Sequence, residues 1–208
     1  MSFVIAIDGP AAAGKGTIGL KLAQIFDFSY LDTGLLYRAV ALKALETGVL
    51  PEIIATNLDE VDLLKSNLRD LNVAKEASRI AVIPEVRLAL MNFQKDFSKK
   101  TGGAILDGRD IGTVICPKAE VKFFISADSS VRAERRFNEL HARGVKTNIK
   151  LVYEEILARD RMDSNRDVSP MVKAEDAFFI DTSNLSIIEA ITIAKQLVEK
   201  VIAEKSLI

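Results

Sequence analysis

The sequence predicts an α/β protein built on a doubly wound, five-stranded parallel sheet that is flanked by helices. Five short apolar runs alternate along the chain with segments in which apolar residues recur at helical spacing. A glycine-rich turn follows the first of these runs and opens the first helical segment. Sheets of this class bind their ligands beyond the carboxyl ends of the strands. The turns that follow the apolar runs are therefore where we expect a functional site.

The first predicted strand, residues 3–7, is continuously apolar and rich in β-branched side chains. This composition is typical of a strand that is buried on both faces of a parallel sheet. The other four strands are predicted at residues 28–32, 103–108, 121–125 and 177–181. Each precedes a helical pattern, so the strands are expected to pair in parallel through crossover helices.

The first helices are predicted from apolar periodicity and from end signals. Residues 15–26 place four apolar side chains on one helical face, namely Ile18, Leu22, Ala23 and Phe26. A second helix, residues 35–47, is closed by Gly48, a residue that suits the left-handed position after a helix.

The later helices follow the same logic. Residues 57–82 are more polar and are predicted to be helical with a loop. Pro84 suits the first turn of the next helix. The last helix, residues 186–205, is amphipathic and opens with Ser186 and Glu189 at the spacing of a capping box.

Composition indicates one globular domain. Of the 208 residues, 49% are hydrophobic and 27% are charged, which is enough apolar material for a single core. The single cysteine, Cys116, excludes an internal disulfide, and residues 3–7 are too short for a signal peptide or membrane span, so we expect a cytoplasmic protein. The formal net charge of −1 does not favour binding to nucleic acid or to a membrane. Residues 132–166, with nine basic and six acidic side chains, indicate a small anionic ligand instead.

The stretch DGPAAAGKGT, residues 8–17, nearly matches a phosphate-binding loop. Gly9, Gly14 and Lys15 have the required spacing between a strand and a helix, where backbone N–H groups face an anion and the lysine reaches the outer phosphates. The next position, where Ser or Thr is usual, is Gly16. The predicted ATP-binding residues of the loop are Gly9, Pro10, Ala11, Ala12, Ala13, Gly14, Lys15, Gly16 and Thr17.

The displaced hydroxyl, which is now on Thr17, distinguishes this loop from that of GTPases. From this position a hydroxyl reaches an inner phosphate more easily. Mg²⁺ is then held through water by the nucleotide and by an acidic group elsewhere, with no direct protein ligand. We therefore expect Mg²⁺ to enter with ATP. The form GKGT is more similar to the loop of nucleoside monophosphate kinases, so a second phosphate site is expected.

Arginines are expected at that second site, because bidentate guanidinium groups are best suited to bring two phosphates together. Four segments carry them, LDTGLLYRAVAL, ASRIAVIPEVR, LDGRDIGT and ARDRMDSNRDVSP. Their candidate arginines are Arg38, Arg87, Arg109, Arg159, Arg161 and Arg166. A solvated helix face is the alternative for any single one of them.

Together with the loop, these segments resemble the cytidylate kinases. The resemblance covers residues 5–191 in the order of the family's motifs, and the pair LDGRDIGT and RDxxDxxR is far more specific than the loop. It is carried by IDGPAAAGKGT, YLDTGLLYRAVAL, EASRIAVIPEVR, LDGRDIGTVICPKAEVKFF, RAERRFNEL, RDRMDSNRDVSPM and AFFIDTSNLSI. The resemblance implies transfer of the γ-phosphoryl group of ATP to CMP and dCMP, giving ADP and CDP or dCDP, in pyrimidine nucleotide metabolism.

The same resemblance implies roles for individual residues. For CMP these are Ser78, Arg87 and Asp110 at the base, Asp163 and Arg159 at the ribose, and Thr33, Tyr37, Arg38, Arg109 and Arg166 toward the phosphate. The catalytic set would be Lys15, Asp107, Arg109 and Arg166. Arg135 and Arg161 would bind ATP from a basic lid. One domain, residues 1–208, would thus consist of a core, a short acceptor-binding segment at about 50–100 and a lid at about 132–166.

The chemistry of cytosine supports the base pocket independently. Cytosine offers an exocyclic amine as donor and N3 and O2 as acceptors, so the carboxylate of Asp110 and the guanidinium of Arg87 match its edge. The carboxylate would repel the O4 atom of uracil, so the pocket should select CMP over UMP. The acceptor phosphate is already ionised near neutral pH, so no general base is required. Asp107, which ends a predicted strand near the loop, would orient a metal-bound water or stabilise the turn.

One departure from the family and three alternatives bear on this hypothesis. Residues 56–77 form a shorter insert than many cytidylate kinases carry, so we expect the acceptor to be less enclosed. The alternatives are a kinase for UMP, AMP or a small hydroxylated metabolite, a non-catalytic nucleotide sensor, and a GTPase, which would lack its NKxD-like motif here. The acceptor profile separates the first two. A monomer is expected, because nothing in the sequence demands an oligomer.

Overall fold

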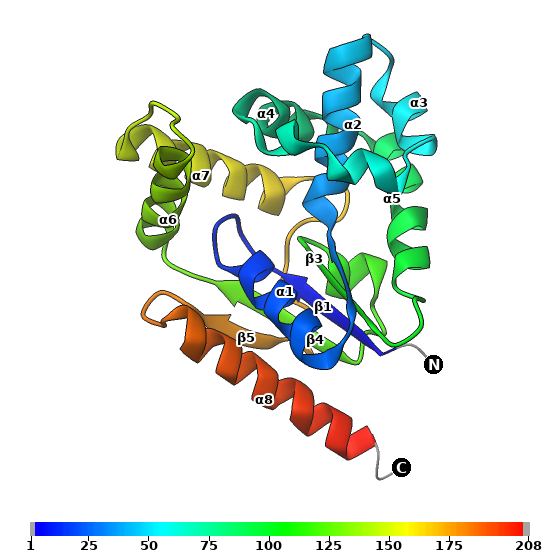
Figure 1. Ribbon diagram of the computed structural model, residues 1–208, viewed down its shortest axis with the longest axis vertical. Coiled ribbons are helices and arrows are strands. Elements are labelled where there is room, and N and C mark those ends of the chain that lie inside the picture. The colour runs from blue at the N-terminus through cyan, green and yellow to red at the C-terminus, as the bar shows by residue number, and fades with distance from the viewer. Residues whose placement is uncertain (1–2, 206–208) are drawn as a thin grey trace.

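The computed structural model describes residues 3–205, so residues 1–2 and 206–208 of the predicted single domain lie outside it. A parallel sheet of five strands in the order β2-β3-β1-β4-β5 confirms the predicted fold class (Figure 1). The strands are β1 (Val4–Asp8), β2 (Ser29–Asp32), β3 (Ala104–Gly108), β4 (Val121–Ser126) and β5 (Phe178–Asp181). Each predicted strand agrees with an observed one to within one residue at either end, because a strand that is buried on both faces must be apolar throughout.

The described residues form eight α-helices and one π-helical turn, Ile111–Ile115, after β3. The helices are α1 (Lys15–Phe26), α2 (Thr33–Thr47), α3 (Pro51–Thr56), α4 (Leu71–Ile80), α5 (Pro84–Phe97), α6 (Ser129–Ala142), α7 (Ile149–Asn165) and α8 (Ile187–Lys205). The predicted capping box is present, since the hydroxyl of Ser186 accepts from the backbone N–H of Glu189 at 3.2 Å and the Glu189 carboxylate accepts from the N–H of Ser186 at 2.8 Å. Among the helices of residues 3–205, none combines the length and apolar character that a membrane span requires.

The segment predicted to be helical with a loop, residues 57–82, holds a single α-helix, α4. Two 3-10 turns precede it, Glu60–Leu64 and Ser66–Arg69. The first turn is closed by a reciprocal capping box between Asp59 and Asp62, and Asp62 also accepts from Nζ of Lys43 on α2 at 2.6 Å. One carboxylate thus fixes the turn both locally and against α2, which apolar periodicity does not detect.

Helices cover both faces of the sheet (Figure 1). On one face α1 and α8 pack together, and Ile5 and Ile7 of β1 meet Leu22 of α1 in a buried cluster. On the other face Ala6 of β1 joins Leu36 of α2 in a second cluster, to which α5 also contributes. Successive residues of β1 therefore enter opposite cores, as the two-residue period of a strand requires.

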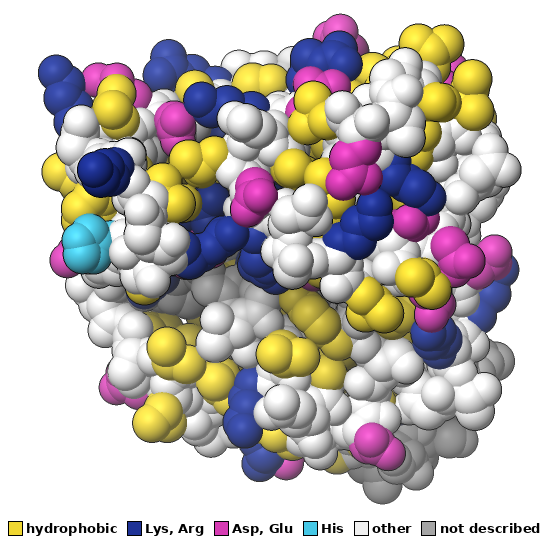
Figure 2. Space-filling model, turned by 45° about the horizontal axis from the view of Figure 1, so that its top comes forward, with side chains coloured by type: hydrophobic (Ala, Val, Ile, Leu, Met, Phe, Trp, Pro, Cys, Tyr) yellow, Lys and Arg dark blue, Asp and Glu magenta, His cyan; other side chains and the backbone are white. Residues whose placement is uncertain are grey.

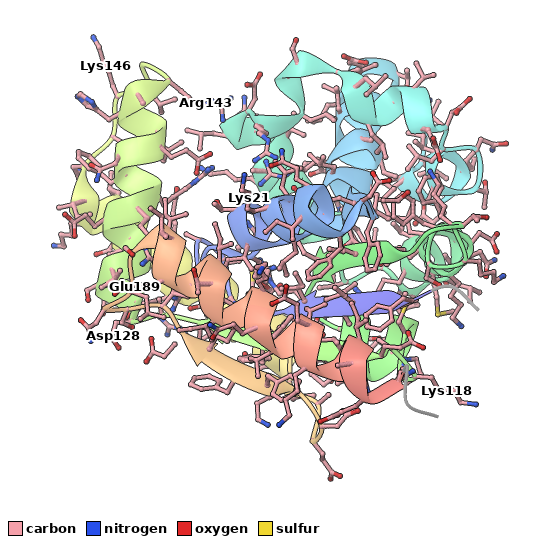
Figure 3. All side chains as sticks on the ribbon, turned by 60° about the horizontal axis from the view of Figure 1, so that its bottom comes forward. Lys21, Lys118, Asp128, Arg143, Lys146 and Glu189 are labelled. Atoms are coloured by element: carbon pink, nitrogen blue, oxygen red, sulfur yellow. The ribbon has the colours of Figure 1, made fainter. Side chains whose placement is uncertain are left out.

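The pair α6 and α7 forms a third, smaller apolar cluster. Leu71, the first residue of α4, and Ala12, in the glycine-rich turn, pack against this cluster. Arg143, which follows α6, extends toward the turn that precedes α4 (Figure 3). There it donates to the carbonyl oxygen of Arg69 at 2.9 Å and to Oδ1 of Asp70 at 3.4 Å. The two helices thus rest on both the glycine-rich turn and α4.

We predict that Gly9→Ala destabilises the fold far more than Gly48→Ala. Both glycines have a positive φ, so a side chain at either costs about 1–2 kcal/mol. A Cβ atom at Gly9 would also overlap the backbone oxygen of Ile125 in β4, whereas Gly48 faces open space. We expect a further loss of about 1–3 kcal/mol in the unfolding free energy of the Gly9 variant, measured by chemical denaturation. Equal losses in the two variants would contradict the close packing of this turn on β4.

Candidate active site

The glycine-rich turn, residues 9–14, leads from β1 into α1. Gly9 and Gly14 have φ angles of 142° and 96°, and Ala12 has one of 59°. Gly14 is the N-cap of α1 and provides no capping side chain, so the first N–H groups of that helix are left for a ligand. A helix start of this kind carries a partial positive charge and suits a phosphate group.

Lys15 is buried inside this turn, with 6% of the residue exposed. Its Nζ donates to the carbonyl oxygen of Pro10 at 2.9 Å. Burial and the nearby charge of Arg109 lower the pKa of Lys15 to about 7, although the charge of Asp107 opposes this. An incoming anion would supply the negative charge that stabilises the protonated lysine.

Two carboxylates end neighbouring strands beside the turn. Asp32 of β2 and Asp107 of β3 are register partners. Burial raises the pKa of Asp107 to about 6 and the Asp32 charge adds to this, while Lys15 opposes it. A Cβ atom at Gly16 would lie 3.6 Å from Oδ2 of Asp107, so this carboxylate lies directly against the turn.

This donor set fits magnesium. Mg²⁺ usually keeps several waters and is bound through one or two carboxylates together with phosphate oxygens. Asp32 and Asp107 provide such a pair, and a cation beside them would relieve the repulsion that raises the pKa of Asp107. Within residues 3–205 no three acidic, histidine or cysteine side chains are grouped to hold a metal directly.

Guanidinium groups converge near the same carboxyl ends. Burial lowers the pKa of Arg159 to about 10, and the charges of Arg109 and Arg38 add to this. Burial also lowers the pKa of Arg38, with contributions from Arg136 and Arg69. Lys and Arg side chains gather around a hollow in the molecular surface (Figure 2). Like charges that depress one another's pKa in this way indicate an anion site.

A buried charged cluster lies beside these arginines. Nη2 of Arg87 donates to the Asp110 carboxylate, and Nη2 of Arg166 lies 3.3 Å from the other carboxylate oxygen without an aligned hydrogen bond. The guanidinium of Arg87 also lies 6.0 Å from the centre of the Tyr37 ring. Four residues predicted to bind CMP, from four separate parts of the chain, are thus brought together.

A second charged pair links the turn after β3 to α7. Nε of Arg109 donates to Oδ2 of Asp163 at 2.7 Å, and Nε of Arg159 lies 3.9 Å from the same oxygen. The hydroxyl of Thr33, at the start of α2, donates to the carbonyl oxygen of Asp107 at 2.7 Å. Thr33, Arg109, Arg159 and Asp163 therefore lie close to the end of β3, whereas Nη1 of Arg38 donates to the carbonyl oxygen of Leu68 at 3.2 Å.

Some predicted residues make contacts outside this group. Ser78 and Arg161 each donate to the carbonyl oxygen four residues earlier in their own helix, at 3.1 and 3.3 Å. Arg161 and Thr17 are exposed. For these three residues, binding of CMP or ATP stays a prediction.

Two lid arginines support the glycine-rich turn from α6. Arg135 donates to the hydroxyl and the carbonyl oxygen of Thr182 at 3.0 and 2.7 Å, and Thr182 in turn donates to the carbonyl oxygen of Ala13 at 3.0 Å. Arg132, which sequence reasoning did not single out, is buried and donates to the carbonyl oxygen of Ala11 at 3.3 Å. Arg135 is thus placed beside the turn through Thr182.

Sequence reasoning also missed Arg69, Asp32 and Tyr30. Nη2 of Arg69 lies 3.4 Å from Oδ2 of Asp32, which joins the segment before α4 to the end of β2. The Tyr30 hydroxyl donates to the Asp107 carboxylate. Asp32 could have been found, because it ends a predicted strand where this architecture binds ligands. Arg69 gave no signal, since it lies in a 3-10 turn without apolar periodicity.

Comparison with known proteins gives a consistent result. The family model for cytidylate kinase matches residues 5–201. A cytidylate kinase of Cereibacter sphaeroides is 49% identical over 199 residues, which cover 96% of each chain. One of Rhizobium meliloti is 44% identical over 211 residues, which cover 99% of this chain and 100% of the relative. The relatives therefore match in length as well as in sequence.

Solved structures support the fold. An uncharacterized protein from Eubacterium ventriosum superposes with a TM-score of 0.60 at 13% identity, covering 95% of this chain and 99% of its own. Shikimate kinase from Bacteroides thetaiotaomicron gives a TM-score of 0.51 at 11% identity, with 95% and 98% coverage. At such low identity these structures show the architecture alone.

We predict that ATP binding is accompanied by proton uptake at pH 8. With its pKa lowered to about 7, Lys15 is mostly neutral at pH 8 in the free protein, and phosphate oxygens beside Nζ would restore its proton. Calorimetric titration in buffers of different ionisation enthalpy should show uptake of close to one proton. Lys15→Arg, which stays protonated throughout, should show none. A wild-type binding enthalpy independent of the buffer would contradict the lowered pKa.

Proposed function

The chain belongs to the cytidylate kinase family, and on that premise we propose that it transfers the γ-phosphoryl group of ATP to CMP, giving ADP and CDP. The observation that carries this proposal is the meeting of two sites at one edge of the sheet. A phosphate-binding turn with buried Lys15 follows β1, and the Arg87 and Asp110 pair lies beyond β3. The arginines whose charges act on one another, Arg38, Arg109 and Arg159, lie near both sites.

On the donor side, the glycine-rich turn would bind the ATP phosphates. Backbone N–H groups at the start of α1 point at the phosphates, and Lys15 neutralises their outer charge. We assign Thr17 to an inner phosphate, and Arg135 and Arg161 to the ATP side of the lid. Asp32 and Asp107 would hold Mg²⁺ through its waters, and the cation supplies charge neutralisation on the phosphates when bound.

On the acceptor side, Asp110 and Arg87 would read the edge of cytosine. Asp110 accepts the exocyclic amine and Arg87 donates to the ring acceptors. Nε of Arg166 donates to the carbonyl oxygen of Ser169, whereas its Nη2 makes only the unaligned 3.3 Å contact with Asp110 among the described residues, so Nη2 would turn to the acceptor phosphate. Tyr37 lines this pocket, and Ser78 would complete it from α4.

The remaining acceptor residues would bind the sugar and the phosphate. Asp163 would hold the ribose, with Arg159 beside it. Thr33, Arg38 and Arg109 would surround the phosphate. The acceptor oxygen is already ionised, so these groups need only position it in line with the γ-phosphoryl group and neutralise charge.

The lid and the acceptor segment would close over these ligands. Gly144, with φ 74°, lies in the connection between the two helices α6 and α7. Arg143 beside it donates to the carbonyl oxygen of Arg69, in the turn before α4. Closure would exclude water, which competes with CMP for the phosphoryl group. We assign the lid to about residues 132–166 and the acceptor segment to about 50–100 of one domain. We also propose dCMP as a substrate, a cytoplasmic role in pyrimidine nucleotide metabolism, and a monomeric state.

We expect ADP formation from ATP and Mg²⁺ to be at least about tenfold faster with CMP or dCMP than with UMP, because Asp110 would face the O4 atom of uracil. The measurement compares CMP, dCMP, UMP, AMP, GMP and no acceptor at equal concentrations. A flat background with every acceptor, despite measurable ATP binding, would favour the nucleotide-sensor alternative.

We expect Arg69→Ala to lower kcat/KM for CMP by about 10-fold, because the Arg69 guanidinium lies close enough to Arg38 to lower its pKa and, among the contacts of residues 3–205, is held by Asp32 at 3.4 Å. Arg79→Ala is the matched control, since Arg79 is an exposed arginine of the same segment, paired with Glu76 on α4. Steady-state kinetics with varied CMP should leave the Arg79 variant within twofold of wild type. Equal effects in both variants would remove Arg69 from the phosphate site.

A further inference from the structure

Tyr30 of β2 approaches the phosphate-binding turn from the side of the sheet. Its hydroxyl donates to Oδ2 of Asp107, at the end of the neighbouring strand. The residue is partly buried, and its ring packs at the edge of the cluster beneath α1. The family resemblance assigns no role to this side chain.

Two glycines of α1 make room for the Tyr30 ring. A Cβ atom at Gly19 would lie 2.8 Å from Cε2 of Tyr30, and one at Gly16 would lie 3.4 Å from the tyrosine hydroxyl. Neither glycine has a positive φ, so the backbone conformation does not require glycine at these positions. Glycine within a helix costs about 1 kcal/mol relative to alanine. The close approach of the Tyr30 ring accounts for Gly19, whereas at Gly16 a Cβ atom would make an ordinary contact with the tyrosine hydroxyl.

The Asp107 carboxylate depends on this contact. Its backbone is fixed by the strand and by Thr33, which donates to its carbonyl oxygen at 2.7 Å. Among the hydrogen bonds of residues 3–205, Tyr30 is the donor to its carboxylate. The same bond opposes the rise that burial and Asp32 cause in the pKa of Asp107. Without the hydroxyl, the side chain would lose its fixed orientation beside the turn.

We propose that Tyr30 is a positioning residue for phosphoryl transfer, whose hydroxyl fills the space beside Gly16 and holds the Asp107 carboxylate against the phosphate-binding turn. A Cβ atom at position 16 would lie 3.4 Å from the Tyr30 hydroxyl and 3.6 Å from Oδ2 of Asp107, so both side chains lie against the start of α1. The inference rests on the proposed function, because Asp107 acts there on the water shell of the nucleotide-bound Mg²⁺. Loss of a hydrogen-bond partner that orients a metal-binding side chain typically lowers activity or metal affinity by about 10-fold to 100-fold.

The first test is Tyr30→Phe, which keeps the ring and removes the hydroxyl. We expect kcat to fall by about 10-fold or more and the half-saturating Mg²⁺ concentration to rise, while KM for CMP stays within twofold, because Asp107 lies on the donor side. Thr192→Val is the control, since it also removes one hydroxyl, which donates to the carbonyl oxygen of Ile188 at 2.8 Å within α8, a helix without any assigned site residue. That variant should keep kcat within twofold. An unchanged kcat in Tyr30→Phe would overturn the proposal.

The second test asks whether Tyr30 acts through Asp107. In an Asp107→Asn background, Tyr30→Phe should lower kcat no further, whereas independent effects that multiply would show a merely structural role for the tyrosine. Thermal unfolding of all four proteins identifies any variant that fails to fold.

The third test is independent of turnover. The carboxyl ¹³C resonance of Asp107, assigned with Asp107→Asn, should shift in nucleotide-free Tyr30→Phe relative to wild type at one fixed alkaline pH, because the hydrogen bond from the hydroxyl is lost. An unmoved resonance would show that the hydroxyl does not hold this carboxylate. If wild type shows no turnover with any acceptor while the resonance still moves, the proposed function fails and the contact between Tyr30 and Asp107 stands.

Discussion

The arrangement of the site depends on the carboxylate of Asp8, the last residue of β1. Its two oxygens accept from the backbone N–H groups of Ile111 and Gly112, at 2.8 and 2.7 Å. Burial raises the pKa of Asp8 to about 6, and these two hydrogen bonds oppose that rise and keep the charged form accessible near neutral pH. Because the phosphate-binding turn follows Asp8 and Asp110 precedes Ile111, the same carboxylate fixes the donor and acceptor sites relative to each other. A Cβ atom at Gly112 would lie 3.3 Å from Oδ2 of Asp8, so a side chain there would press on this carboxylate.

Around Asp8 several arginine side chains are buried close to one another, an arrangement that suits anionic ligands. Arg159 and Arg38 are buried beside other arginines, which lowers the pKa of each. Only part of this positive charge is matched by protein carboxylates, such as Asp163. By contrast, the contacts that join the lid to the acceptor segment, such as Arg143 with Asp70, are exposed pairs worth at most about 1 kcal/mol. Breaking these exposed contacts would therefore cost little free energy and would leave the hydrogen bonds of the sheet intact.

The sequence predicted best what depends on local pattern. The five strands and the phosphate-binding turn follow from continuous apolar runs and glycine spacing. The resemblance to cytidylate kinases assigned Arg87 and Asp110 to the base and Arg166 to the phosphate, and in the structure both arginines lie against the Asp110 carboxylate. Tyr30 was missed because an aromatic residue in a strand is usually assigned to the hydrophobic core. Arg69 was missed because its position is set by a 3-10 turn whose carbonyl oxygens accept from the distant Arg38 and Arg143. Contacts between distant segments carry no local periodicity.

The short segment before α4 also changes how enclosure of the acceptor is achieved. The sequence led us to expect a more open acceptor site, because the insert is shorter than in many cytidylate kinases. In the structure, Leu71 packs against the apolar cluster of α6 and α7, and Arg143 donates to the carbonyl oxygen of Arg69. The α6 and α7 pair thus contacts the short segment before α4 directly. Since Arg69 contacts Asp32 at the same time, one short turn links the α6 and α7 pair to the end of β2.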